Sequence, residues 1–225
     1  MKGASRCEAI VLATRPLGEA DVLAVLFTAE HGKVRCAARG AKKSKRRFAG
    51  GLGGGAVGTA ELHPPRTGLW RLDAFTPRLD HGALGRDLSR FAFVAYLCEL
   101  TDALTEEHHV EPDLFTTLHE AIAITIASPP DPLVLRRYEL ALLQQLGHLP
   151  ALDHCCVCGS EISAGDVPFD ADRGGALCLL HGRGASTMPT EVLTAAAGLA
   201  SSGEVPSLAA PLRRRLRDLT AGQLR

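Results

Sequence analysis

Along the first eighty residues, apolar positions come in short runs or alternate with polar ones. Turn-forming stretches such as Glu30-His31-Gly32-Lys33 and Pro64-Pro65 separate the segments, and short apolar segments bounded in this way are typical of β-strands. Five segments fit, at 7–14, 22–29, 34–39, 57–62 and 69–75. Five short strands predict a small closed or half-closed barrel. The OB-fold is one such barrel, and a plain structural barrel of another type is also compatible with the pattern.

After Pro77 the apolar period changes to that of helices. A helix that is apolar on most sides is predicted from Leu84 to Leu104, and it should be buried. A second is predicted from Asp113 to Pro129 and a third from Pro132 to Gly147, so that the three pack as a bundle. Two further helices are predicted, one over 190–200 and one from Ala209 that carries Arg213, Arg214, Arg215 and Arg217.

Four potential metal ligands interrupt this helical region. Cys155 and Cys158 are separated by two residues, as are Cys178 and His181, and nineteen residues lie between the pairs. This spacing is typical of zinc sites in which two tight turns converge on one ion. It predicts a zinc ribbon holding one structural Zn²⁺, with His154 and Cys156 outside the ligand set. The alternative is a cluster of reduced, metal-free cysteines.

Positive charge is concentrated in one loop, although the chain as a whole has 25 basic and 25 acidic residues. No Asp or Glu occurs from His31 to Ala60, so nothing local neutralises this loop. A polyanion such as a nucleic-acid backbone is the natural counterpart, and a merely solvated loop is the alternative. The cations of the loop are Arg39, Lys42, Lys43, Lys45, Arg46 and Arg47.

The glycines that follow the loop match G-x-G-x-x-G at positions 53, 55 and 58. A dinucleotide fingerprint should follow a strand and open a helix, whereas this match follows a basic loop and leads into a predicted strand. We therefore interpret these glycines as a flexible connector.

Other classes of protein fit the sequence less well. A zinc hydrolase or deaminase needs an open coordination position and a nearby general base, and the nearest acid, Glu161, lacks the H-x-E context. The apolar run 9–13 is too short for a signal peptide, and nothing approaches a membrane span of about 20 apolar residues. Paired cysteine spacing suits a reducing compartment, so we expect a cytoplasmic protein.

Taken together, several segments resemble the RecO family of recombination mediators and DNA repair proteins, over nearly the whole chain. They are Leu17-Gly18-Glu19-Ala20-Asp21, Phe27-Thr28-Ala29-Glu30-His31-Gly32-Lys33, Ala38-Arg39-Gly40-Ala41-Lys42-Lys43-Ser44-Lys45, Leu69-Trp70-Arg71-Leu72, Arg136-Arg137-Tyr138-Glu139-Leu140 and the Cys155/Cys158/Cys178 segment. One departure is His181, which stands where relatives with zinc usually have a fourth cysteine.

The resemblance implies an α+β protein with an N-terminal five-stranded OB-fold barrel at 1–80 and a helical bundle at 81–150. It also implies an embedded zinc-ribbon module at 151–185, and C-terminal helices at 186–225 that pack with the helical domain. It implies a nucleoid-associated protein that is not an enzyme, and that binds single- and double-stranded DNA through the six loop cations and anneals complementary strands. It also implies docking of the acidic C-terminal tail of single-stranded DNA-binding protein near Arg136, Arg137 and Tyr138, and RecA loading together with RecR. We expect a monomer that does not bind membranes; the alternative function is a zinc-ribbon adaptor that binds proteins without annealing DNA.

Overall fold

The computed structural model describes residues 4–44, 46–48, 51–79, 81–162, 164–201 and 208–224. Two compact units divide the chain, Met1–Pro130 and Asp131–Arg225, and each is considered by itself. The division falls inside the range 81–150 that the sequence analysis assigned to one bundle. Two of the three predicted helices belong to the first unit and the third to the second.

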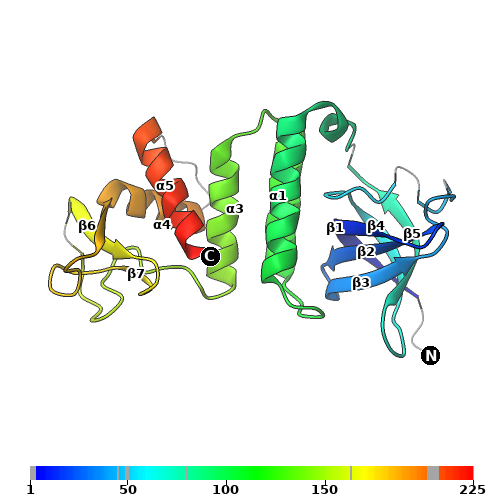
Figure 1. The fold of residues 1–225 in the computed structure, drawn as a ribbon, viewed down its shortest axis with the longest axis horizontal. Coiled ribbons are helices and arrows are strands. Elements are labelled where there is room, and N and C mark those ends of the chain that lie inside the picture. Colours follow the sequence, from blue (N-terminus) through cyan, green and yellow to red (C-terminus); the bar gives the residue numbers. More distant parts are fainter. Residues whose placement is uncertain are drawn as a thin grey trace. The chain divides into compact units, whose positions relative to one another are not determined.

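The first unit begins with five strands that close into a barrel (Figure 1). In the order β1-β2-β3-β5-β4, neighbouring strands pair, and β4 pairs back with β1. All the pairings are antiparallel except the short parallel pairing of β3 with β5. This closed five-stranded arrangement confirms the predicted OB-fold. The strands are β1 (Ser5–Leu17), β2 (Asp21–Thr28), β3 (Gly32–Ala38), β4 (Val57–His63) and β5 (Trp70–Pro77).

The barrel is filled by the side chains that alternate inward along its strands. Small residues such as Ala24 and Ala60 lie beside large ones such as Leu26 and Phe75, and all four are at most 1% exposed. Alternation with a period of two is what a half-buried strand requires, which explains why the sequence pattern locates the strands well.

Helices complete the first unit: η1 (His81–Arg86), α1 (Leu88–Leu104) and α2 (Pro112–Ala127). The carboxylate of Asp87 caps α1 by accepting hydrogen bonds from the backbone N–H groups of Ser89 and Arg90. Helix α1 packs against β1, where the Cys98 thiol lies 3.8 Å from the carbonyl oxygen of Val11.

The second unit combines three helices with a small sheet. Strands β6 (Asp166–Asp170), β7 (Gly175–Ala176) and β8 (Ser186–Pro189) form an antiparallel sheet in the order β7-β6-β8. Its apolar face and α3 (Pro132–Gln145), α4 (Thr190–Ser201) and α5 (Ala210–Gln223) share one core, in which Leu140, Val192 and Leu216 are fully buried. Among the helices of the described residues, none is both long and apolar enough to span a bilayer.

Candidate nucleic-acid interface and metal centre

The basic loop joins β3 to β4. Lys45 lies outside the described residues, and the other five predicted cations are exposed: Arg39, Lys42, Lys43, Arg46 and Arg47. None of the ion pairs found among the described residues involves these five. Their charges therefore face solvent without a neutralising carboxylate, as a phosphate-binding surface requires.

Phe48 anchors this loop to the barrel. Its ring is 4% exposed and belongs to the barrel core, while the guanidinium of Arg47 lies 5.3 Å from its centroid. The backbone N–H of Phe75 in β5 donates to the carbonyl of Arg47 at 2.9 Å. The guanidinium of Arg47 also donates to the carbonyl of Arg39 at 2.8 Å, which joins the two ends of the basic stretch.

The same loop lies against the turn between β1 and β2. The backbone N–H of Gly40 donates to the carboxylate of Asp21 at 2.8 Å, and the Lys42 ammonium donates to the carbonyl of Gly18 at 2.9 Å. The β1–β2 turn belongs to the surface on which OB-folds hold oligonucleotides. Sequence spacing could not reveal the role of Asp21 as an acceptor for the loop, because the two partners are far apart in the chain.

One glycine after the loop, Gly55, is packed more closely than a flexible connector would be. The Gly55 N–H donates to the carbonyl of Val11 at 2.7 Å. Its φ is +81°, and a Cβ atom added there would lie 2.1 Å from Cγ1 of Val94 in α1. Gly55 therefore allows α1 to approach the barrel closely, in a conformation that other residues rarely adopt.

The three residues suggested for tail docking lie on α3, where one is buried and another is paired within the second unit. Tyr138 is 1% exposed. The side chain of Arg136 is 12% exposed, donates to Glu139 at 2.5 Å and donates to the hydroxyl of Thr220 in α5 at 2.9 Å. Arg137 is half-buried. Arg136 thus links α3 to α5, and Tyr138 is a buried residue rather than a surface contact.

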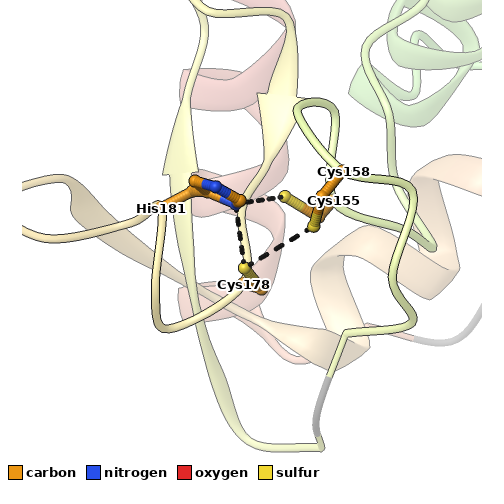
Figure 2. A group of neighbouring side chains, drawn as sticks. All are labelled: Cys155, Cys158, Cys178 and His181. Atoms are coloured by element: carbon orange, nitrogen blue, oxygen red, sulfur yellow. Dashed lines mark hydrogen bonds between the residues drawn. The ribbon is translucent and has the colours of Figure 1, made fainter.

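The four predicted metal ligands converge on one point (Figure 2). Their ligand atoms all lie within 4.8 Å of one another. The Sγ atoms of Cys158 and Cys178 are 3.9 Å apart, and Nδ1 of His181 lies 3.2 Å from Sγ of Cys178 and 3.7 Å from Sγ of Cys155. A tetrahedral ion with metal–sulfur bonds of about 2.3 Å would place its sulfurs about 3.8 Å apart. The cluster could therefore hold a metal ion with all four positions filled by protein.

Two tight turns bring these ligands together. The backbone N–H of Gly159 donates to the carbonyl of Cys155 at 2.8 Å, and that of Gly182 donates to the carbonyl of Cys178 at 2.8 Å. The first turn is tied to β7 because the N–H of Cys156 donates to the carbonyl of Ala176. The group of four converging ligands does not include Cys156.

Hydrogen bonds within the cluster favour the deprotonated thiol. They lower the pKa of Cys155 to about 5, with the backbone N–H of Cys178 as the largest cause, followed by those of Cys158 and Val157. Hydrogen bonds with the side chains of Cys155 and then Cys158 raise the pKa of His181. By contrast, burial raises the pKa of Cys7, Cys36 and Cys98 to about 12, so these three are core thiols rather than ligands.

Comparison with known proteins assigns a family to this combination of barrel, helices and cysteine cluster. Residues 1–77 match the family model described as recombination protein O N terminal, and residues 85–222 match recombination protein O C terminal. The chain belongs to the RecO family. Similar relatives, each named DNA repair protein RecO, include that of Anaeromyxobacter dehalogenans strain 2CP-C, which is 40% identical over 94% of this chain and 87% of the relative. That of Myxococcus xanthus is 35% identical over the same shares, and that of Geobacter sulfurreducens is 36% identical over 84% and 77%. As a RecO-family chain, it has a role in DNA repair.

Proposed function

We propose that this chain is a DNA-binding recombination mediator that contacts the phosphates of single- and double-stranded DNA through the basic loop. The observation that carries the proposal is the exposure of five loop cations, none of which pairs with a carboxylate in the part of the chain that the structure describes. Membership of the RecO family and the OB-fold barrel support it. The proposed contacts are Arg39, Lys42, Lys43, Lys45, Arg46 and Arg47.

Annealing would follow from charge neutralisation. When the loop holds phosphates of two strands, it lowers their mutual repulsion and allows complementary bases to pair. Among the described aromatics of the barrel, Phe27, Phe48 and Phe75 are buried and Trp70 is partly buried against the core. Phosphate contact should therefore outweigh base stacking, so that binding does not depend on base sequence.

The proposal extends to partners and to one structural zinc ion. Zinc would be held by Cys155, Cys158, Cys178 and His181, because three thiolates and an imidazole with no open position suit this metal. We further propose that the chain acts in the cytoplasm and, with RecR, helps load RecA onto DNA coated with single-stranded DNA-binding protein. The region of Arg136, Arg137 and Tyr138 would dock the acidic tail of that protein. Tyr138 is buried and Arg136 is paired with Glu139, so these two side chains would support the docking surface from within rather than contact the tail directly.

Salt dependence tests the loop. If six cations each contact a phosphate, the log–log slope of single-strand affinity against salt should be about −4, at roughly −0.7 per contact. Replacing Lys42, Lys43, Lys45, Arg46 and Arg47 by Ala should flatten this slope and slow the annealing of complementary oligonucleotides. The matched control is Arg214→Ala with Arg217→Ala, which removes exposed cations from α5. An unchanged slope in the folded loop variant would refute the assignment.

A further inference from the structure

Helix α5 presents three arginines on one exposed face. Arg213 and Arg217 are four residues apart and Arg214 and Arg217 are three apart, so their side chains are neighbours on the surface of the helix. All three arginines are exposed, whereas Leu216 and Leu219 are buried in the core of the second unit. Arg213, Arg214 and Arg217 are called the α5 arginine face below.

Helix stability does not explain these cations. Arg213 and Arg214 lie close to the N-terminal end of α5, where the helix dipole is positive and cations are disfavoured. Nε of Arg213 donates to the carbonyl of Leu208 at 2.9 Å, which orders the side chain without neutralising it. Among the ion pairs of the described residues, the face has one carboxylate partner, Asp218, at 2.9 Å from a guanidinium nitrogen of Arg217. Three arginines and this one aspartate leave a net charge of +2.

Thr220 connects this face to the region of α3 proposed for tail docking. Its hydroxyl accepts a hydrogen bond from the guanidinium of Arg136 at 2.9 Å and donates to the carbonyl of Arg217 at 3.1 Å. The turn of α5 that carries Arg217 is therefore adjacent to Arg136. Because Arg136 is largely buried and paired with Glu139, its charge is already engaged within the unit. The α5 arginine face supplies exposed positive charge beside it.

The character of the surface favours an acidic peptide over a nucleic acid. Sites for single strands combine dense positive charge with exposed aromatic rings. The face has less charge than the basic loop, and the two aromatic residues of the second unit, Tyr138 and Phe169, are at most 5% exposed. Guanidinium groups bind carboxylates through two parallel hydrogen bonds. The first turn of α5 also exposes Ala210 and Pro211, so a peptide with acidic and apolar side chains matches both features.

We propose that the α5 arginine face binds an acidic peptide segment of a partner protein. The inference rests on the docking of an acidic tail proposed above and deepens it, because it assigns the direct contacts to α5 rather than to Arg136 and Tyr138. The three guanidinium groups would donate hydrogen bonds to carboxylates of the segment. Because the face is exposed and the attraction is between charges, affinity should fall as the salt concentration is raised.

Fluorescence anisotropy on the full chain tests the face with two short labelled peptides. One is rich in Asp with a few Leu residues, and the other has Asn in place of every Asp. The Asp peptide should bind saturably and the Asn peptide should not. The triple variant Arg213→Gln, Arg214→Gln and Arg217→Gln should bind the Asp peptide at least about tenfold more weakly, because it loses charge-assisted hydrogen bonds. The matched control is Arg215→Gln, which should leave affinity unchanged because its guanidinium donates to the carbonyl of Thr187 in β8.

The outcomes separate this inference from the proposed function. The triple variant should keep the wild-type unfolding midpoint and affinity for single-stranded DNA. If it fails to fold, Arg214→Gln with Arg217→Gln, which keeps the bond between Arg213 and Leu208, gives the same test. Unchanged peptide affinity in the folded variant, equal binding of the Asn peptide, or an equal loss of DNA affinity would overturn the inference.

The site of any peptide binding decides which proposal fails. If binding of the Asp peptide depended on Arg137 but not on the α5 arginine face, the inference would be wrong while docking on α3 would stand. If the wild-type chain bound neither peptide, both the inference and the proposed tail docking would be wrong, and the salt dependence of the basic loop would still test DNA binding by itself.

Discussion

The ammonium group of Lys33 lies 3.2 Å from Oδ1 of Asp102 and also donates to the backbone carbonyl of Asp102 at 2.5 Å. Lys33 belongs to β3 and Asp102 to the last turn of α1, so the pair ties the barrel to its helix within the first unit. The Lys33 side chain is only 7% exposed. A lysine buried to this degree is tolerated because its charge is paired.

Replacing Lys33 by Met should therefore lower the free energy of unfolding. We expect a loss of about 2–4 kcal/mol, because Asp102 would keep its charge at a partly buried site without its partner. Urea titration followed by the fluorescence of Trp70, the single tryptophan, which lies in β5, measures the stability of this unit.

The exposed pair Arg35–Glu107 provides the control on the same strand. Its side chains are 51% and 41% exposed, so Arg35→Gln should cost less than about 1 kcal/mol. Equal losses of unfolding free energy in the two variants would mean that the buried pair Lys33–Asp102 stabilises the unit no more than the exposed pair does.

Phe48 should couple barrel stability to DNA affinity. Phe48→Ala is expected to cost about 3–5 kcal/mol of unfolding free energy, because it empties a buried site, and to weaken DNA binding by releasing the loop from the barrel. Phe48→Leu should keep the fold and most of the affinity. The control Phe91→Ala, at a 53% exposed position on α1, should change neither quantity much. If the folded Phe48→Ala variant bound DNA with wild-type affinity, the loop cations would not need Phe48 to hold the loop on the barrel.

Local spacing explains what could be predicted from the sequence. The strands follow from alternation with a period of two and from the turns between them, and the ligand set follows from two pairs that each span a single turn. Cys155 and Cys178 are far apart in the chain, yet each pair carries its own signal. For this reason the barrel and the cluster were both found without knowledge of long-range contacts.

Long-range contacts explain what the sequence could not predict. Arg136 looks like a candidate for a surface site, but its pairing depends on α5, which supplies Thr220 from much later in the chain. Gly55 looks like part of a flexible connector until Val94 is packed against it. The division of the chain into two units at Pro130 could likewise not be predicted from the sequence, because α2 and α3 both have strong helical patterns and only a short link separates them.

The contact between Gly55 and Val94 can be measured by a double-mutant cycle. Gly55→Ala should destabilise the first unit by about 2–3 kcal/mol, because the new methyl group overlaps Cγ1 of Val94 and the backbone has positive φ. Adding Val94→Ala removes that atom, so the two changes together should cost less than their sum by about 1 kcal/mol.

Gly51→Ala isolates the backbone contribution to that loss. Gly51 has the same φ of +81°, but nothing lies within 4 Å of an added Cβ atom. It should therefore cost only about 1 kcal/mol, the strain of the left-handed conformation. A Gly55→Ala loss no larger than this would argue against close packing of α1 on the barrel. Fluorescence-monitored urea unfolding measures all four variants.

Cys156 and Cys158 are separated by one residue and have opposite expected roles in metal binding. Cys158→Ser should lose the bound zinc, because it removes one of four thiolate or imidazole ligands, whereas Cys156→Ser should retain one ion per chain. Removing zinc with a chelator should abolish hydrogen-exchange protection of the β6–β8 sheet while the barrel stays protected, because metal binding contributes on the order of 10 kcal/mol to the folding of such segments. Metal content by elemental analysis and exchange by mass spectrometry report the two effects separately. If the sheet remained protected in the chelated protein, its apolar core with α4 would be sufficient to hold it, and the ion would not be a structural element of this unit.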